Sequence, residues 1–154
     1  MNIDVILWGF GATLILTTIM TISKYLGFTR IDLPFILGTL FTSNRDKASW
    51  LGFVIHLIMG WLFAFIYNMA MELSGLKTWW FGTAIGFVHA AFVLTVGLQI
   101  VNYLHPRMAR PFQGPTPTRQ LEPPGFLAVN YGTATPMVTF FAHLVYGGML
   151  GTFL

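Results

Sequence analysis

Three histidines stand inside long apolar stretches of this 154-residue chain, and they are the strongest candidates for chemistry. They are His56, His89 and His143. A polar side chain inside a bilayer is costly and therefore points to a functional site. A neutral imidazole can also serve as an axial ligand of haem. The alternative is that each ring only hydrogen-bonds to a neighbouring helix. The threonines available for that role are Thr13, Thr17, Thr95 and Thr139.

The spacing of these histidines favours some cofactors over others. His56 and His143 lie six and seven residues after Trp50 and Pro136, where their apolar stretches begin. Both are therefore expected about 10 Å inside one membrane face, at a rise of 1.5 Å per residue. His89 lies on a stretch of opposite direction and is expected deeper. This arrangement suits haem or a chlorophyll-type pigment, including bacteriochlorophyll, better than a compact three-histidine zinc site. No cofactor is assigned with certainty.

Other kinds of catalytic site are absent from the sequence. No aspartate or glutamate lies inside an apolar stretch, which excludes a carboxylate-rich di-metal centre. The chain has no cysteine, so neither a disulfide framework nor a thiolate nucleophile is available. No Ser/His/Asp grouping stands out either. We therefore do not expect an enzyme.

Composition indicates that lipid is the solvent for most of the chain. Hydrophobic residues make up 55% and charged residues 8%, against about a quarter charged in soluble domains. The net charge of +3 comes from eight basic residues that are too scattered for a nucleic-acid footprint. The lipid bilayer is the expected partner, and nucleic acid is not.

Four stretches are long and apolar enough to cross a membrane. They cover about residues 5–23, 50–71, 79–104 and 135–154. A hydrocarbon core about 30 Å thick needs about 20 helical residues. The sequence therefore predicts an all-α protein, a polytopic transmembrane four-helix bundle that forms a single membrane domain over residues 1–154.

The distribution of lysine and arginine predicts the orientation. The loops over about residues 24–49 and 105–134 hold seven of these residues, whereas the opposite side holds only Lys77. By the positive-inside rule both loops are cytoplasmic, so both termini lie on the non-cytoplasmic side.

A weak internal repeat relates the two halves of the chain. Residues 10–14 resemble 81–85, residues 32–34 resemble 122–124, and residues 56–60 resemble 143–147, in the same order. This pattern predicts two duplicated parallel helical hairpins, related by an axis along the membrane normal.

Each predicted span carries a stripe of small residues at four-residue spacing. Such a stripe allows close approach of helix backbones and predicts a compact bundle. The predicted packing glycines are Gly52, Gly60, Gly82, Gly86, Gly147 and Gly151.

The two predicted cytoplasmic loops are more than plain linkers. Residues 31–41 are too short to span and too apolar for water, so they lie at the interface or fold back under the bundle. The loop of residues 105–134 carries six of the eight prolines. It is either a stiff spacer or a docking strip for a neighbouring protein. Its candidate docking residues are Arg107, Arg110, Arg119 and Glu122.

Several short motifs resemble one known group of proteins. They are Asp32-Leu33-Pro34 with Leu37-Gly38-Thr39, His56 with Gly60 and Phe63-Ala64, His105-Pro106-Arg107-Met108, Gly114-Pro115-Thr116-Pro117, and Thr135-Pro136 with His143 and Tyr146-Gly147. Together they resemble a family of small uncharacterised four-span bacterial membrane proteins without an assigned activity. The resemblance implies a location in the bacterial inner membrane and adds no mechanism.

Three classes of function are compatible with these features. The sequence favours a structural or accessory subunit of a larger membrane complex, paired with another membrane protein or with a second copy. The first alternative is a module that binds haem or pigment through its intramembrane histidines. The second alternative is a small transporter or channel, which the duplicated hairpins favour.

Overall fold

The computed structural model describes residues 3–110 and 112–154, and these residues are mostly helical with no β-strand among them. This confirms the predicted all-α class. The elements are α1 (Ile3–Tyr25), α2 (Leu33–Thr39), α3 (Arg45–Ser74), α4 (Trp79–Phe92), η1 (Val93–Gly97), α5 (Leu98–Leu104), η2 (Phe126–Tyr131) and α6 (Thr135–Phe153).

Among the described residues, three of the four predicted spans form helices that are long and apolar enough to cross a membrane. They are α1 with 23 residues, α3 with 30 residues, and the helix Trp79–Leu104 with 26 residues. α6 is 19 residues long, but Pro136, His143 and Tyr146 make it more polar, and it is not among the three.

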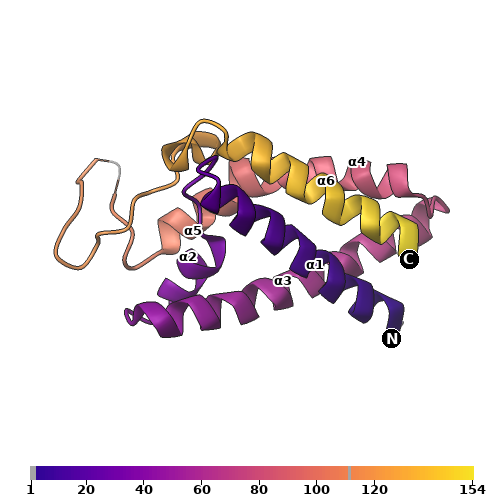
Figure 1. Ribbon diagram of the computed structural model, residues 1–154, viewed down its shortest axis with the longest axis horizontal. Helices are drawn as coiled ribbons and strands as arrows, with labels where there is room; N and C mark the ends of the chain where they lie inside the picture. Colours follow the sequence, from indigo (N-terminus) through magenta and orange to yellow (C-terminus); the bar gives the residue numbers. More distant parts are fainter. Residues whose placement is uncertain (1–2, 111) are drawn as a thin grey trace.

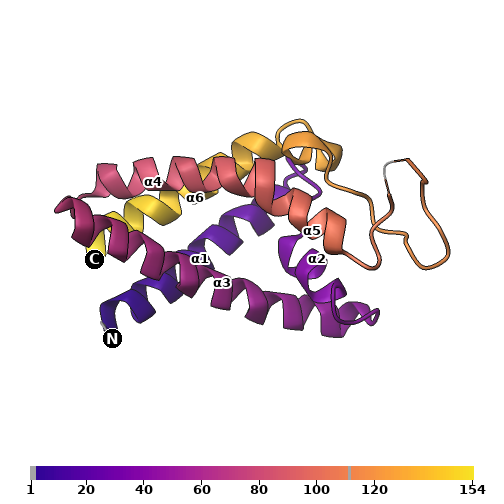
Figure 2. The same cartoon turned by 180° about the vertical axis from the view of Figure 1, so that it is seen from behind.

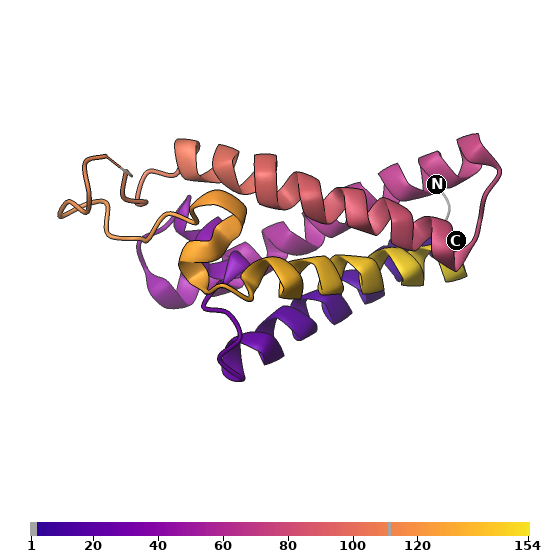
Figure 3. The same ribbon diagram turned by 90° about the horizontal axis from the view of Figure 1, so that it is seen from above.

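The helices run between two distinct ends of the molecule (Figures 1 and 2). Both termini and the α3–α4 turn lie at one end, which we call the terminal end. Residues 26–44, 105–110 and 112–134 lie at the other, the loop end, where part of the later segment projects beyond the helices (Figures 1 and 3).

Local sequence explains where α3 begins and ends. The side chain of Asn44 accepts a hydrogen bond of 2.9 Å from the Lys47 N–H and so caps the first turn. Gly75 has a φ of 68°, the left-handed conformation that commonly stops a helix. The helix exceeds the predicted apolar stretch because polar residues form a turn at each end.

Close approach of glycine backbones holds the long helices together. A side chain on Gly82 would collide with the Gly147 carbonyl, and one on Gly86 with the His143 carbonyl. α4 and α6 are thus in near backbone contact. Gly60 lies against Thr13 in the same way and joins α3 to α1. The structure places the glycine stripes at helix interfaces.

The apolar segment of residues 31–41 folds back against α3. It forms α2, whose first turn is capped by the Asp32 carboxylate, which accepts a hydrogen bond of 3.1 Å from the Phe35 N–H. Gly52 of α3 lies against the Pro34 carbonyl, and Gly38 of α2 lies against Ala48. Of the two predicted placements, the structure shows the fold-back.

The helix Trp79–Leu104 contains one irregular turn. Its residues Val93–Gly97, η1, are π-helical, and the N–H of Leu98 donates to the Val93 carbonyl. A π turn widens the helix locally and is frequent at functional sites.

Candidate functional site

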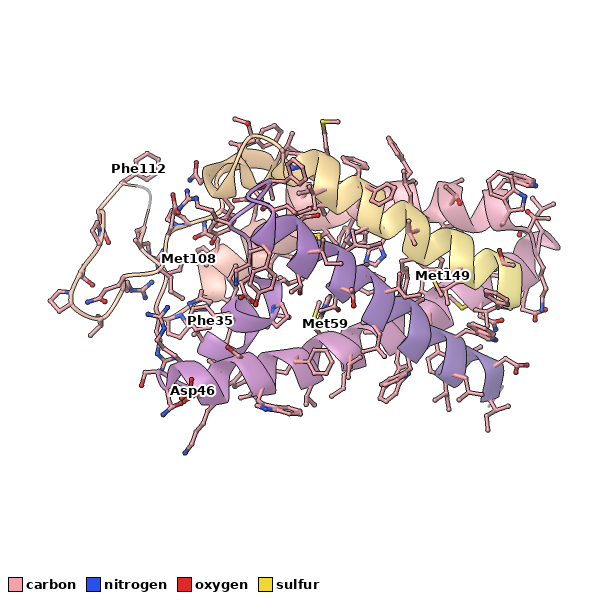
Figure 4. All side chains as sticks on the ribbon, in the orientation of Figure 1. Phe35, Asp46, Met59, Met108, Phe112 and Met149 are labelled. Carbon is pink, nitrogen blue, oxygen red and sulfur yellow. The ribbon has the colours of Figure 1, made fainter. Side chains whose placement is uncertain are left out.

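The three histidines of the long helices converge on one internal cavity. His56 from α3 and His143 from α6 are buried, and His89 from α4 is half-buried. All three line a cavity of about 90 Å³. Met59, which also lines it, marks its position between the helices in Figure 4.

Hydrogen bonds fix the proton positions on two of the rings. His143 Nδ1 donates to the Thr139 carbonyl at 2.8 Å, so its Nδ1 carries the proton. His56 Nδ1 lies 3.2 Å from the Thr17 hydroxyl, which donates its only proton to the Thr13 carbonyl at 2.7 Å. His56 Nδ1 must therefore donate too. The Nε2 atom of each neutral ring is left as a proton acceptor.

His89 is held by aromatic contacts and one hydroxyl. Its ring stacks on Phe63 at 3.8 Å between centroids and meets the His143 ring edge-on at 4.7 Å. Its Nδ1 lies 3.2 Å from the Tyr67 hydroxyl. Within the described part of the chain, no hydrogen bond reaches the Nε2 atom of any of the three rings.

A second cavity leads from the histidines toward the loop end. Its volume is about 130 Å³, and His56 and His143 line it as well as the first cavity. Its wall includes Thr139, whose buried Oγ1 has no hydrogen-bond partner among the described residues. Lys24 and Asp32, which form an ion pair, line its end nearest the loop end. This second cavity therefore reaches the histidines from the loop end, with Thr17, Thr21 and Thr139 as polar groups in a wall that is otherwise largely apolar.

A dense apolar core lies between these cavities and the terminal end. Val5, Ala64, Met71 and Leu150 are each at most 1% exposed and pack into one cluster with Tyr67. Access to the histidines therefore differs between the two ends, with the more open route at the loop end.

The two cavities are too small for a large cofactor in this arrangement of the helices. Their volumes of about 90 and 130 Å³ fall below the roughly 300 Å³ at which ligand pockets begin, so a macrocycle needs the helices to separate. No group of three or more His, Cys, Asp or Glu suited to a metal ion occurs among the described residues. Ordered water fits, since a water needs about 10–15 Å³ and polar partners. Macrocycle ligation by the histidines stays a prediction.

Two tyrosines belong to this site that were not predicted from the sequence. Tyr146 donates a hydrogen bond of 2.6 Å to the Gly60 carbonyl, and its ring meets that of Tyr67 edge-on. Tyr146 follows His143 by three residues, so helical spacing could have placed both on one face. The sequence holds no comparable signal that pairs Tyr67 with His89.

The four candidate docking residues are engaged at the loop end. Arg107 donates to the carbonyls of Thr39 and Leu40, and Arg119 donates to those of His105 and Met108. Glu122 forms an ion pair with Arg30 at 3.0 Å. Arg110 lies over the ring of Tyr103. These contacts favour the spacer interpretation of the loop.

His105 joins the loop of residues 105–134 to α2. The ring is fully buried, its Nε2–H donates to the Ile36 carbonyl at 3.0 Å, and its Nδ1 accepts from the Arg107 N–H at 3.1 Å. Burial lowers the pKa of His105, the hydrogen bond to the Ile36 carbonyl opposes part of this effect, and the charges of Arg107 and Arg119 lower the pKa further. The neutral ring is therefore the form that holds these elements together.

No protein-family model, no curated protein and no solved structure matches the chain.

Proposed function

We propose that the chain is a four-span protein of the bacterial inner membrane with both termini outside. An even number of spans accounts for both termini lying at one end (Figure 1). The loop end carries seven of the eight basic residues, which favours the cytoplasm on that side. The bacterial setting follows from the resemblance of the motifs.

The two-hairpin repeat belongs to this proposal. His56 and His143 line the same cavities from α3 and α6. In each hairpin the glycine four residues after the histidine packs against the antiparallel neighbour: Gly60 against Thr13 of α1, and Gly147 against Gly82 of α4. Equivalent packing in the two hairpins is what a duplication would produce.

We propose that the protein works as a small proton-conducting transporter or channel. The observation that carries this proposal is the pair of adjacent cavities that links His56 and His143 to the loop end. Both residues line these water-sized spaces, and both rings keep an Nε2 lone pair. Histidine gains and loses a proton near neutral pH more readily than other side chains, and such rings form relays in membrane proteins.

Polar groups continue this route toward the terminal end. The proton path runs from His143 to His89, whose Nδ1 meets the Tyr67 hydroxyl. Asn68, the next residue of α3, has a buried Oδ1 without a hydrogen-bond partner among the described residues, and Glu72 lies one turn further along the helix. Because an apolar core surrounds this part of the route, proton conduction there would depend on Tyr67 and Asn68.

Proton flux into liposomes tests the proposal. Purified protein is reconstituted with an internal pH dye, and a valinomycin-driven potassium potential starts the uptake. We expect proton uptake above that of empty liposomes. The His56→Ala/His143→Ala double variant should lose most of this uptake. Met59 lines the same cavity but has no proton-binding group. The control variant Met59→Leu should therefore conduct protons as the wild type does. Wild-type flux equal to empty liposomes contradicts the proposal.

A second candidate is the accessory subunit that the sequence favours. Phe112 supports it, because this apolar side chain is fully exposed on the loop that projects from the loop end (Figure 4). An exposed aromatic side chain is a common anchor at protein interfaces. Solubilised membranes should then show the chain in a larger complex on a native gel. Phe112→Ser should release it, whereas Phe126→Ser, at another exposed apolar site, should not.

A further inference from the structure

A basic groove lies at the loop end, apart from the histidine cavities. It occupies about 580 Å³ between the α2–α3 connection and the loop of residues 105–134, within the size range of ligand pockets. Arg45 and Arg107 line it from opposite chain segments. The other polar lining residues are Thr39, Ser43, Thr118 and Gln120. No lining residue is acidic.

Among the described residues, no carboxylate forms an ion pair with either arginine of the groove. The ion pairs within residues 3–110 and 112–154 are Lys24–Asp32, Arg30–Glu122 and Lys77–Glu72. Arg107 uses Nη1 for carbonyl groups, which leaves its other nitrogens as donors. The Arg45 guanidinium lies over the ring of Phe35, with 5.4 Å to the centroid.

One acidic residue lies close in sequence but not in the groove. Asp46 follows Arg45 directly and does not line the groove. Adjacent positions on a helix do not face each other. Arg45 also occupies the first turn of α3, where the helix dipole adds positive potential. The groove is therefore electropositive.

The depth of the groove matches the lipid headgroups. Trp50 is 73% exposed and lies five residues after Arg45 on α3. Exposed tryptophans mark the membrane interface, and five residues correspond to about 7.5 Å along a helix. Arg45 thus lies one turn and a half outside the tryptophan, where phosphates of the leaflet are found.

We propose that this groove binds the phosphate group of an anionic lipid headgroup in the leaflet at the loop end. Guanidinium groups bind phosphate through two parallel hydrogen bonds. The hydroxyl and amide side chains supply further donors to the phosphate and the headgroup. The same chemistry would accept free phosphate, so the experiment separates these two sources.

Lipid binding to delipidated protein in mild detergent tests the proposal. Native mass spectrometry follows titration with dioctanoyl phosphatidylglycerol, with dioctanoyl phosphatidylcholine as the headgroup without net charge. We expect saturable binding of the phosphatidylglycerol. Arg45→Gln should weaken it about tenfold, the loss expected for a charge-assisted hydrogen bond. Arg45 is chosen for substitution instead of Arg107, because Arg107 also holds α2 in place.

Lys47→Gln is the matched control. It removes the same charge from the same helix turn but from outside the groove, so it should change the affinity less than about twofold. Competition by inorganic phosphate would assign the groove to the free anion, and its failure to compete would assign it to the lipid. Equal binding by wild type and Arg45→Gln overturns the proposal, as does equal affinity for phosphatidylcholine. Thermal melts confirm that each variant is folded.

Discussion

At the residue scale, the buried polar side chains decide what the interior of the bundle can do. His56, His143 and Thr139 are almost completely buried, yet two imidazole Nε2 atoms and one hydroxyl remain without hydrogen-bond partners among the described residues. Buried polar groups are normally paired. Water bound in the two cavities could pair with these groups, and the proposed proton transfer would use the same atoms.

The Tyr146 hydroxyl is expected to stabilise the contact between α6 and α3. Tyr146→Phe removes the buried hydrogen bond to the Gly60 carbonyl and should lower the free energy of unfolding by about 1 kcal/mol. Unfolding in a titration with SDS measures this loss. Tyr103→Phe, at a side chain that is 72% exposed, should change it little. Equal stability of both variants would show that the Tyr146 bond contributes nothing.

His105 should make the loop end sensitive to acid. Its pKa is lowered in the folded protein, chiefly by burial, so the unfolded chain binds more protons between the folded-state pKa and the ordinary value of 6.5. The stabilisation is complete above that pH and is lost as the pH falls toward the folded-state pKa. When the pH falls from 7.5 to 5.5, the α2 amides of the wild type should therefore lose protection from hydrogen exchange, after correction for intrinsic rates. The loss should be smaller in His105→Gln. An identical pH response in both proteins would refute this role.

At the element scale, close backbone contacts and one irregular turn shape the site. α4 and α6 touch through glycines, while the π turn η1 contributes Val93 and Gly97 to the wall of the smaller cavity. The tight contact aligns His89 with His143, and the irregular turn keeps space beside them. The site therefore depends both on the close packing of α4 against α6 and on the irregular π turn η1.

Enlarging a glycine on the α4–α6 interface should force the helices apart. Gly86→Leu would place its side chain against the His143 carbonyl, and overpacking of this kind costs about 1–3 kcal/mol or more. Ile85→Leu, the neighbouring change at nearly constant volume, should cost much less. Thermal melts in detergent compare the two variants. If both are tolerated equally, the glycine stripe is not an interface.

At the scale of the whole molecule, the two ends differ in charge and in openness. The loop end carries the basic groove, the mouth of the larger cavity and seven of the eight basic residues. The terminal end is closed by the apolar core. In the proposed conduction, protons would therefore enter at the loop end, and their passage through the apolar core would limit the flux.

Cysteine labelling in intact cells tests the proposed orientation. Thr118→Cys lies on the exposed loop at the loop end, and Ser74→Cys lies at the terminal end beside the α3–α4 turn. An impermeant thiol reagent should label the second variant and spare the first, because basic loops are retained in the cytoplasm. Native cysteines do not interfere, since the chain has none. The opposite pattern would reverse the orientation.

The sequence by itself determined the helices and the faces they bury. Length and hydropathy of residues 79–104 predicted that helix, and four-residue spacing placed Gly82, Gly86 and the histidines on narrow faces, because both signals are local along one helix. Only the tertiary structure decided that His89 meets Tyr67 and His143, and that Arg45 and Arg107 line one groove. These groups come from distant segments, and their distances depend on helix crossing and loop return, which no periodicity in one segment encodes.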